Sequence, residues 1–150
     1  MNMATRKHPK NPWISNSRLA RLLIFFSRHR IPFVSRFYCL FLGCDIGRPL
    51  PRSIFLPHPQ GIVIRSTSEI GEDVVIGHQV TLGGRDLTDG APIIEDGAYI
   101  SAGAKVLGKV RVGRGATIGA NAVVTKDVPP GRVVVGGNRL TDNPSPYALD

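Results

Sequence analysis

A six-residue period runs through the sequence from residue 62 onward. This period restricts the chain to a few possible folds. One aliphatic side chain recurs in each period, at Ile64, Ile70, Ile76, Leu82, Ile94, Ile100, Val106, Val112, Ile118 and Val124. A small or β-branched residue follows four positions later, at Ser68, Val74, Val80, Ala98, Ala104, Val110, Ala116, Ala122 and Val128. Such regular repetition predicts an all-β solenoid, in which each hexad supplies one short strand and one turn. Both repeated positions are expected to point into the narrow interior of the stacked coils.

The composition agrees with a solenoid. The 150 residues include 17 Gly and 12 Pro but only 7% aromatic residues, which suits many turns and small interior side chains. Each coil would pair its backbone with the coils above and below, so both ends of the stack need covers. We expect N-terminal helices to cover one end and the Pro-rich tail from Pro129 to cover the other. The loop 84–93 is the one break in the hexads.

Residues 15–43 are predicted to form two short amphipathic helices. Apolar residues recur at helical spacing on either side of an expected break at Pro32: Leu19, Leu22, Leu23 and Phe26, then Phe33, Phe37, Tyr38 and Phe41. Residues 1–12 are polar and basic and are expected to fray. We therefore divide the chain into a basic tail with a helical segment at 1–43, the repeat domain at 44–140 and a C-terminal tail at 141–150.

Positive charge is concentrated before the repeats. Residues 1–52 hold ten Lys or Arg and one acid, a net charge of +9, whereas residues 53–150 sum to −1. Five arginines interrupt the helical segment too often for a membrane span: Arg18, Arg21, Arg28, Arg30 and Arg36. Two interpretations of residues 15–43 stay open. The helices dock onto the rest of the protein or a neighbouring subunit, or they lie on a membrane surface.

The N-terminal segment predicts neither a signal peptide nor a nucleic-acid site. It has no apolar stretch followed by a small-residue cleavage site within the first dozen residues, which predicts a cytoplasmic protein. Peripheral contact at the inner face of the membrane is the alternative that the basic helices leave open. Interleaved aromatic residues and a recognition helix are lacking, so no nucleic-acid partner is expected. Cys39 and Cys44 have no metal-ligand spacing and are interpreted as small apolar residues.

Four segments carry a resemblance to a known family: LPHPQGIVI, VTLGG, ISAGAKVLG and VTKDVPPG. They resemble the serine acetyltransferase branch of the hexapeptide-repeat acyltransferases, and within it the short members found in polysaccharide biosynthesis. The resemblance covers roughly residues 40–136. It implies a left-handed parallel β-helix with three hexads per coil, assembled as a homotrimer. It also implies that acetyl-CoA binds in the groove between adjacent subunits.

The resemblance assigns the catalytic role to His58. A neutral imidazole can take the proton of an acceptor hydroxyl as that hydroxyl attacks the thioester. Neither a Cys nor a Ser is placed as a covalent carrier, so direct transfer is predicted. Asp45 matches an acid that orients the histidine in the family, although the run from Asp45 to His58 is about two residues shorter than usual. A plain turn aspartate is the alternative for Asp45.

Five further residues match cofactor-binding positions of the family. Gly83 and Gly84 open the loop 84–93, where a side chain would obstruct the pantetheine arm. Ala102 and Ala120 match small residues that let the cofactor lie against the coil. Lys126 is expected to face the 3′-phosphate. For the two glycines and the two alanines, the alternative is a tight turn of the solenoid. For Lys126, the alternative is a solvated surface lysine.

Departures from the family pattern bear on the acceptor. Serine acetyltransferases carry an Asp before the catalytic His and an Arg-His pair at the end of the loop, where this chain has Pro57, Gly90 and Ala91. We therefore expect a hydroxyl of a sugar or glycan in exopolysaccharide or cell-surface polysaccharide synthesis as the acceptor. L-Serine, as in cysteine biosynthesis, is the first alternative, and a non-catalytic trimeric β-helix scaffold is the second.

No metal site is expected, because none of the four histidines lies one coil of about 18 residues from another. His58 and His78 differ by twenty positions. His78 follows Gly77 in a turn and is predicted to be exposed.

Overall fold

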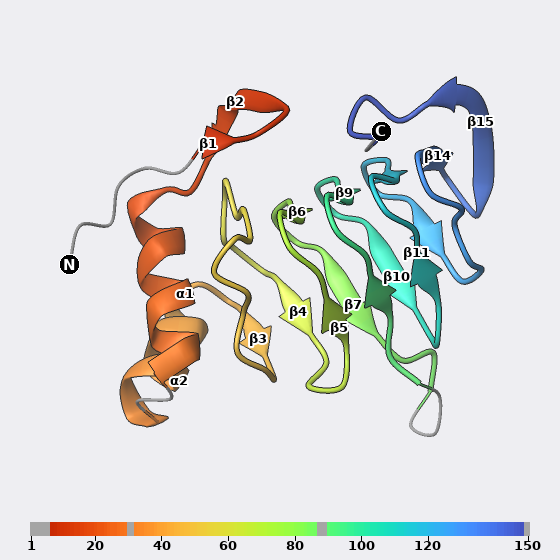
Figure 1. The fold of residues 1–150 in the computed structure, drawn as a ribbon. Coiled ribbons are helices and arrows are strands. Elements are labelled where there is room, and N and C mark those ends of the chain that lie inside the picture. The colour runs from red at the N-terminus through yellow and green to blue at the C-terminus, as the bar shows by residue number, and fades with distance from the viewer. Residues whose placement is uncertain (1–6, 30–31, 87–89, 149–150) are drawn as a thin grey trace.

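The chain forms a left-handed parallel β-helix with two helices at its N-terminal end (Figure 1). The computed structural model describes residues 7–29, 32–86 and 90–148. The parallel strands are β3 (Asp45–Ile46), β4 (Val63–Ile64), β5 (Glu69–Ile70), β6 (Val75–Ile76), β7 (Thr81–Gly83), β8 (Ile93–Ile94), β9 (Tyr99–Ile100), β10 (Lys105–Leu107), β11 (Arg111–Val112), β12 (Thr117–Ile118), β13 (Val123–Val124) and β14 (Arg132–Val135).

The strands stack into three sheets. Two have the orders β13-β10-β7-β4-β3 and β11-β8-β5, and the third, which ends with β15 (Arg139–Pro144), has the order β15-β14-β12-β9-β6. Val63 pairs with Thr81, 18 residues on, which is three hexads per coil. Thr81 pairs with Lys105, 24 residues on, because the loop 84–93 adds one hexad length to that coil. The register therefore follows the sequence period on both sides of the break.

The interior is filled by the two repeated positions. None of the ten aliphatic residues and none of the nine small or β-branched residues predicted to point inward is more than 9% exposed. Even Ser68, the polar member of the series, is fully buried. The six-residue period is confirmed as the pattern of the core.

The N-terminal helices divide between covering the solenoid and facing outward. α1 (Arg18–His29) begins with the Ser17 hydroxyl accepting a hydrogen bond from the backbone N–H of Ala20, and it buries Ala20, Leu23 and Ile24 in the common core. α2 (Pro32–Phe41) follows, and most of its large apolar side chains are exposed. Arg30 lies outside the described residues. No helix in the described ranges is long and apolar enough to cross a membrane.

Both ends of the chain differ from the sequence prediction. Within the segment expected to fray, β1 (Lys7–His8) pairs with β2 (Asn11–Ser15). The buried His8 ring packs edge-on against Phe55 and Tyr147, with ring centroids 5.1 and 5.7 Å away. At the other end β15 (Arg139–Pro144) turns back antiparallel onto β14, so the expected boundary at residue 140 falls inside a strand (Figure 1).

Candidate active site

His58 lies in a loop where the chain departs from the hexad geometry. Pro57 and Pro59 flank it, and the buried Leu56 and Ile62 anchor the loop on either side. The imidazole is exposed, although residue 58 stands at the phase that carries core aliphatics further along. The irregular loop therefore keeps the ring out of the apolar interior, where an unpaired polar group is costly.

Neighbouring backbone fixes this loop from two sides. On one side, the N–H of Gly61 donates to Leu42 O, and the N–H of Asp45 donates to Ile62 O, both at 2.9 Å. The Cys44 thiol also donates to Pro59 O at 3.3 Å. On the other side, the N–H of Gln79 donates to Gln60 O at 2.8 Å. An exposed side chain on a backbone held in this way is pre-positioned for a reaction at the surface.

His78 lies beside His58, which the sequence analysis did not predict. The two ring centroids are 6.1 Å apart and the rings are inclined at 80°. His78 belongs to the turn after β6 and is half-buried, so the expectation of an exposed turn residue was wrong. The signal was present in the spacing, since 20 residues is one coil of 18 plus two residues that the loop at 57–61 absorbs.

Ala102 and Ala120 continue the edge of the solenoid on which His78 lies. The N–H of Gly103 donates to His78 O, and the N–H of Asn121 donates to Ala102 O, both at 2.9 Å. Ala102 is half-buried and Ala120 is exposed, and neither side chain extends beyond Cβ. A strip of small residues thus runs from the two histidines along successive turns.

Gly83, Gly84 and Lys126 lie at the opposite edge of the sheet β13-β10-β7-β4-β3. Gly83 ends β7, and its carbonyl accepts a hydrogen bond from the N–H of Gly108 at 2.8 Å. A methyl group at Gly84 would lie 2.8 Å from Asp86 O, so the local backbone alone explains why a glycine stands there. A methyl group at Gly83 would meet no atom closer than 3.6 Å. Lys126 is exposed. A single chain does not bring these three residues next to His58.

Asp45 lies in β3, the end strand of the same sheet, in register with Val63. Its side chain is exposed. Within the described parts of the chain, Asp45 and His58 share no hydrogen bond or ion pair, although the backbone of Asp45 holds Ile62 four residues beyond His58. Its role as the acid that orients His58 stays a prediction.

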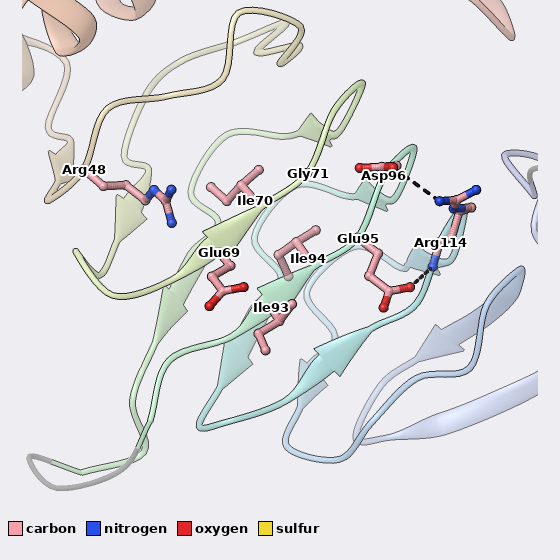
Figure 2. Close-up of a pocket in the computed structure, with 9 residues that line it drawn as sticks. All are labelled: Arg48, Glu69, Ile70, Gly71, Ile93, Ile94, Glu95, Asp96 and Arg114. Atoms are coloured by element: carbon pink, nitrogen blue, oxygen red, sulfur yellow. Dashed lines mark hydrogen bonds and ion pairs between the residues drawn. The ribbon is translucent and has the colours of Figure 1, made fainter.

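A shallow cleft of about 530 Å³ lies on another sheet, β11-β8-β5 (Figure 2). Two of its three acids, Glu95 and Asp96, are engaged by nearby arginines. Arg114 lies 3.5 Å from Asp96 and donates its backbone N–H to Glu95 at 2.9 Å, and Arg111 lies 2.7 Å from Glu95. His58 and His78 do not line it. We therefore place the candidate site at the histidine edge and not in this cleft.

A search of the described residues finds no group of three or more His, Cys, Asp or Glu side chains that could hold a metal ion.

Known proteins similar to this chain share both its repeats and its fold. The family described as bacterial transferase hexapeptide (six repeats) matches residues 91–126. Serine acetyltransferase of Mycobacterium tuberculosis is 46% identical over 106 residues, which are 68% of this chain and 46% of that protein. The structure of Neisseria gonorrhoeae serine acetyltransferase in complex with serine matches with a TM-score of 0.64 and 34% identity, over 81% of this chain and 53% of that chain. A serine acetyltransferase in complex with CoA matches with a TM-score of 0.59 and 32% identity, over 81% and 53%.

These relatives overturn the acceptor predicted from the sequence. The glycan acceptor was wrong, because the similar proteins and structures are named serine acetyltransferases, which agrees with the first alternative. The residues at Pro57, Gly90 and Ala91 therefore do not by themselves indicate a glycan acceptor. The chain spans about half the length of the curated relatives it matches.

Proposed function

Because the chain belongs to the hexapeptide-repeat transferases, in their serine acetyltransferase-like branch, we propose that it transfers the acetyl group of acetyl-CoA to the hydroxyl of L-serine. The observation that carries the proposal is the pair His58 and His78, 6.1 Å apart, at the end of the Ala102–Ala120 strip. This pair supports the proposal because it would supply a base and a second polar group at one edge of the solenoid, with the strip beside it for an extended ligand.

In the proposed reaction, His58 takes the proton of the serine hydroxyl while the oxygen attacks the thioester carbonyl carbon. The resulting tetrahedral intermediate collapses with cleavage of the carbon–sulfur bond. The CoA thiolate leaves and takes up the proton that His58 carried. The products are O-acetylserine and CoA, and the imidazole returns to its starting form.

Both cysteines support direct transfer without an acyl-enzyme. Burial raises the pKa of the Cys39 thiol and the pKa of the Cys44 thiol, which keeps both in the protonated, poorly nucleophilic form. Cys44 is buried and its thiol donates to Pro59 O, so it helps to hold the His58 loop. Neither thiol is suited to carry the acetyl group.

Acetyl-CoA fits the strip of small residues. Ala102 and Ala120 lie on successive turns and their side chains end at Cβ, so the pantetheine arm would lie close to the coil there. Gly83 and Lys126 lie at the other edge of the sheet, where Lys126 would meet the 3′-phosphate. The division of these residues between two edges supports a groove completed by two adjacent subunits of a homotrimer, one subunit supplying each edge.

His78 offers a group for the serine carboxylate in place of the Arg-His pair that the chain lacks at Gly90 and Ala91. An imidazole N–H beside the base would hold the carboxylate while the hydroxyl faces His58. Hydrogen bonds to charged groups contribute ~1.5–3 kcal/mol, which corresponds to about tenfold or more in affinity.

The acceptor is tested by CoA release from acetyl-CoA with L-serine, compared with L-alanine, which lacks only the hydroxyl. We expect CoA release with L-serine, together with a product of the mass of O-acetylserine. L-Alanine should give no more than background thioester hydrolysis. If a folded protein that binds CoA does not acetylate L-serine, the proposal is wrong.

Replacing His78 tests the carboxylate contact. His78→Ala is expected to raise the KM for L-serine about tenfold or more, with the KM for acetyl-CoA nearly unchanged. His78→Asn, which keeps a donor, should recover part of the loss. An unchanged KM for L-serine in His78→Ala would show that His78 does not touch the acceptor.

A further inference from the structure

Within the described part of the chain, α2 carries more exposed large apolar side chains than any other element. Five of the ten exposed large apolar side chains in the described chain lie on this one helix: Phe33, Val34, Phe37, Leu40 and Phe41. Phe33 is 88% exposed and Leu40 77%. Phe33, Phe37, Leu40 and Phe41 recur at i, i+4, i+7 and i+8, which places them on one face of the helix. Contiguous exposure of this kind marks a surface that meets a partner.

The two N-terminal helices have different roles, and this separates the interpretations left open by the sequence. α1 buries Ala20, Leu23 and Ile24 in the core and covers the open end of the solenoid. α2 contacts α1 on its inner side, where Tyr38 donates to Leu19 O, and it presents the phenylalanine face outward. Covering the end of the solenoid therefore accounts for the apolar face of α1. It does not account for the exposed apolar face of α2.

The positive charge around this face favours an anionic surface as its partner. No acid occurs before Asp45, and residues 1–52 carry a net charge of +9. Arg18, Arg28 and Arg36 are exposed on the two helices. A second copy docking through the same face would bring like charges together, because a two-fold interface apposes identical surfaces. An anionic surface would instead neutralise the arginines while apolar side chains enter it.

We propose that the outer face of α2, formed by Phe33, Phe37, Leu40 and Phe41, binds an anionic lipid bilayer. The helix has ten residues and is ~15 Å long, so it lies on the surface instead of spanning the membrane. The phenylalanine and leucine side chains enter the boundary between headgroups and acyl chains, and the arginines contact lipid phosphates. The solenoid continues away from the bilayer, since β14 and β15 lie at its opposite end (Figure 1).

Co-sedimentation of the full chain with vesicles tests this surface. Vesicles of phosphatidylcholine alone are compared with vesicles that also contain phosphatidylglycerol, at low and at high salt. We expect binding to the anionic vesicles at low salt, which fades as salt screens the arginines. Phe37→Ser/Leu40→Ser should abolish it, and Arg18→Gln/Arg36→Gln should weaken it about fivefold for each arginine removed.

Leu140→Ser is the control, because Leu140 is another exposed leucine and lies in β15 at the far end of the solenoid. It should bind vesicles as the unchanged protein does. The proposal is overturned if the folded protein ignores anionic vesicles at low salt, if it binds neutral vesicles equally well, or if Phe37→Ser/Leu40→Ser binds normally. If light scattering instead shows a larger assembly that Phe37→Ser/Leu40→Ser dissolves, the face joins copies of the chain and the lipid proposal is likewise wrong. The assay needs no substrate, so its outcome is independent of the proposed acetyl transfer.

Discussion

His58→Ala is expected to lower kcat for serine acetylation by about 10²–10⁴-fold, the range that a general base contributes. The KM for acetyl-CoA should change little, because the imidazole acts on the acceptor hydroxyl and the Ala102–Ala120 strip is left intact. The fold should also survive, since the side chain is exposed and the loop is held by its backbone. Steady-state kinetics, with CoA affinity measured by calorimetry, checks both parts of this result.

His29→Ala is the matched control for that variant. His29 is also an exposed histidine, at the last residue of α1, and it has no place in the proposed reaction. It should turn over normally. Turnover by His58→Ala within about tenfold of the unchanged protein would remove His58 from the role of base.

The regular part of the fold was predictable because one physical constraint repeats. The narrow interior accepts an aliphatic residue and a small residue from every hexad. The same six-residue pattern of buried side chains therefore recurs in each coil. The first coil lacks this signal. Ile54, Phe55 and Leu56 are consecutive and all fully buried, which no six-residue template predicts.

Long-range contacts account for the N-terminal hairpin that the sequence did not predict. His8 is buried between Phe55 and Tyr147, which are 47 and 139 residues away in the chain. Local composition around His8 is polar and basic, so it predicts an exposed end. Only the folded solenoid brings Phe55 and Tyr147 together around His8.

The candidate site was predicted in part, and its gaps have a geometric cause. The structure brings His58, Ala102 and Ala120 to one edge of the solenoid through His78, and their roles in catalysis and cofactor binding stay predictions. His78 was missed because its spacing of 20 residues from His58 matches one coil of 18 only once two residues are known to lie in the irregular loop at 57–61. The predicted glycan acceptor was wrong because it relied on residues absent at Gly90 and Ala91, whereas the similar proteins are named serine acetyltransferases.

Leucine at Ala102 and Ala120 together is expected to raise the KM for acetyl-CoA by about a hundredfold, at the upper end of what added bulk in a fitted contact costs. Both alanines lie along the edge that begins at the histidines, and neither side chain fills the core, so the solenoid should fold with leucine at either place. The kcat at saturating acetyl-CoA should fall much less, because His58 and His78 are untouched. Direct binding of CoA by calorimetry separates this loss of affinity from a loss of catalysis.

Arg114→Leu supplies the control for the strip, because Arg114 holds the same place in the preceding hexad, two residues after Val112, as Ala120 holds after Ile118. Its side chain is exposed on another edge, and its ion pair with Asp96 at 3.5 Å is solvated, so its loss should cost little. Arg114→Leu and Ala102→Leu/Ala120→Leu both introduce leucine on the solenoid surface, but on different edges. If Ala102→Leu/Ala120→Leu binds CoA as Arg114→Leu does, the cofactor does not lie along the histidine edge, and the groove must be sought on another face of the coil.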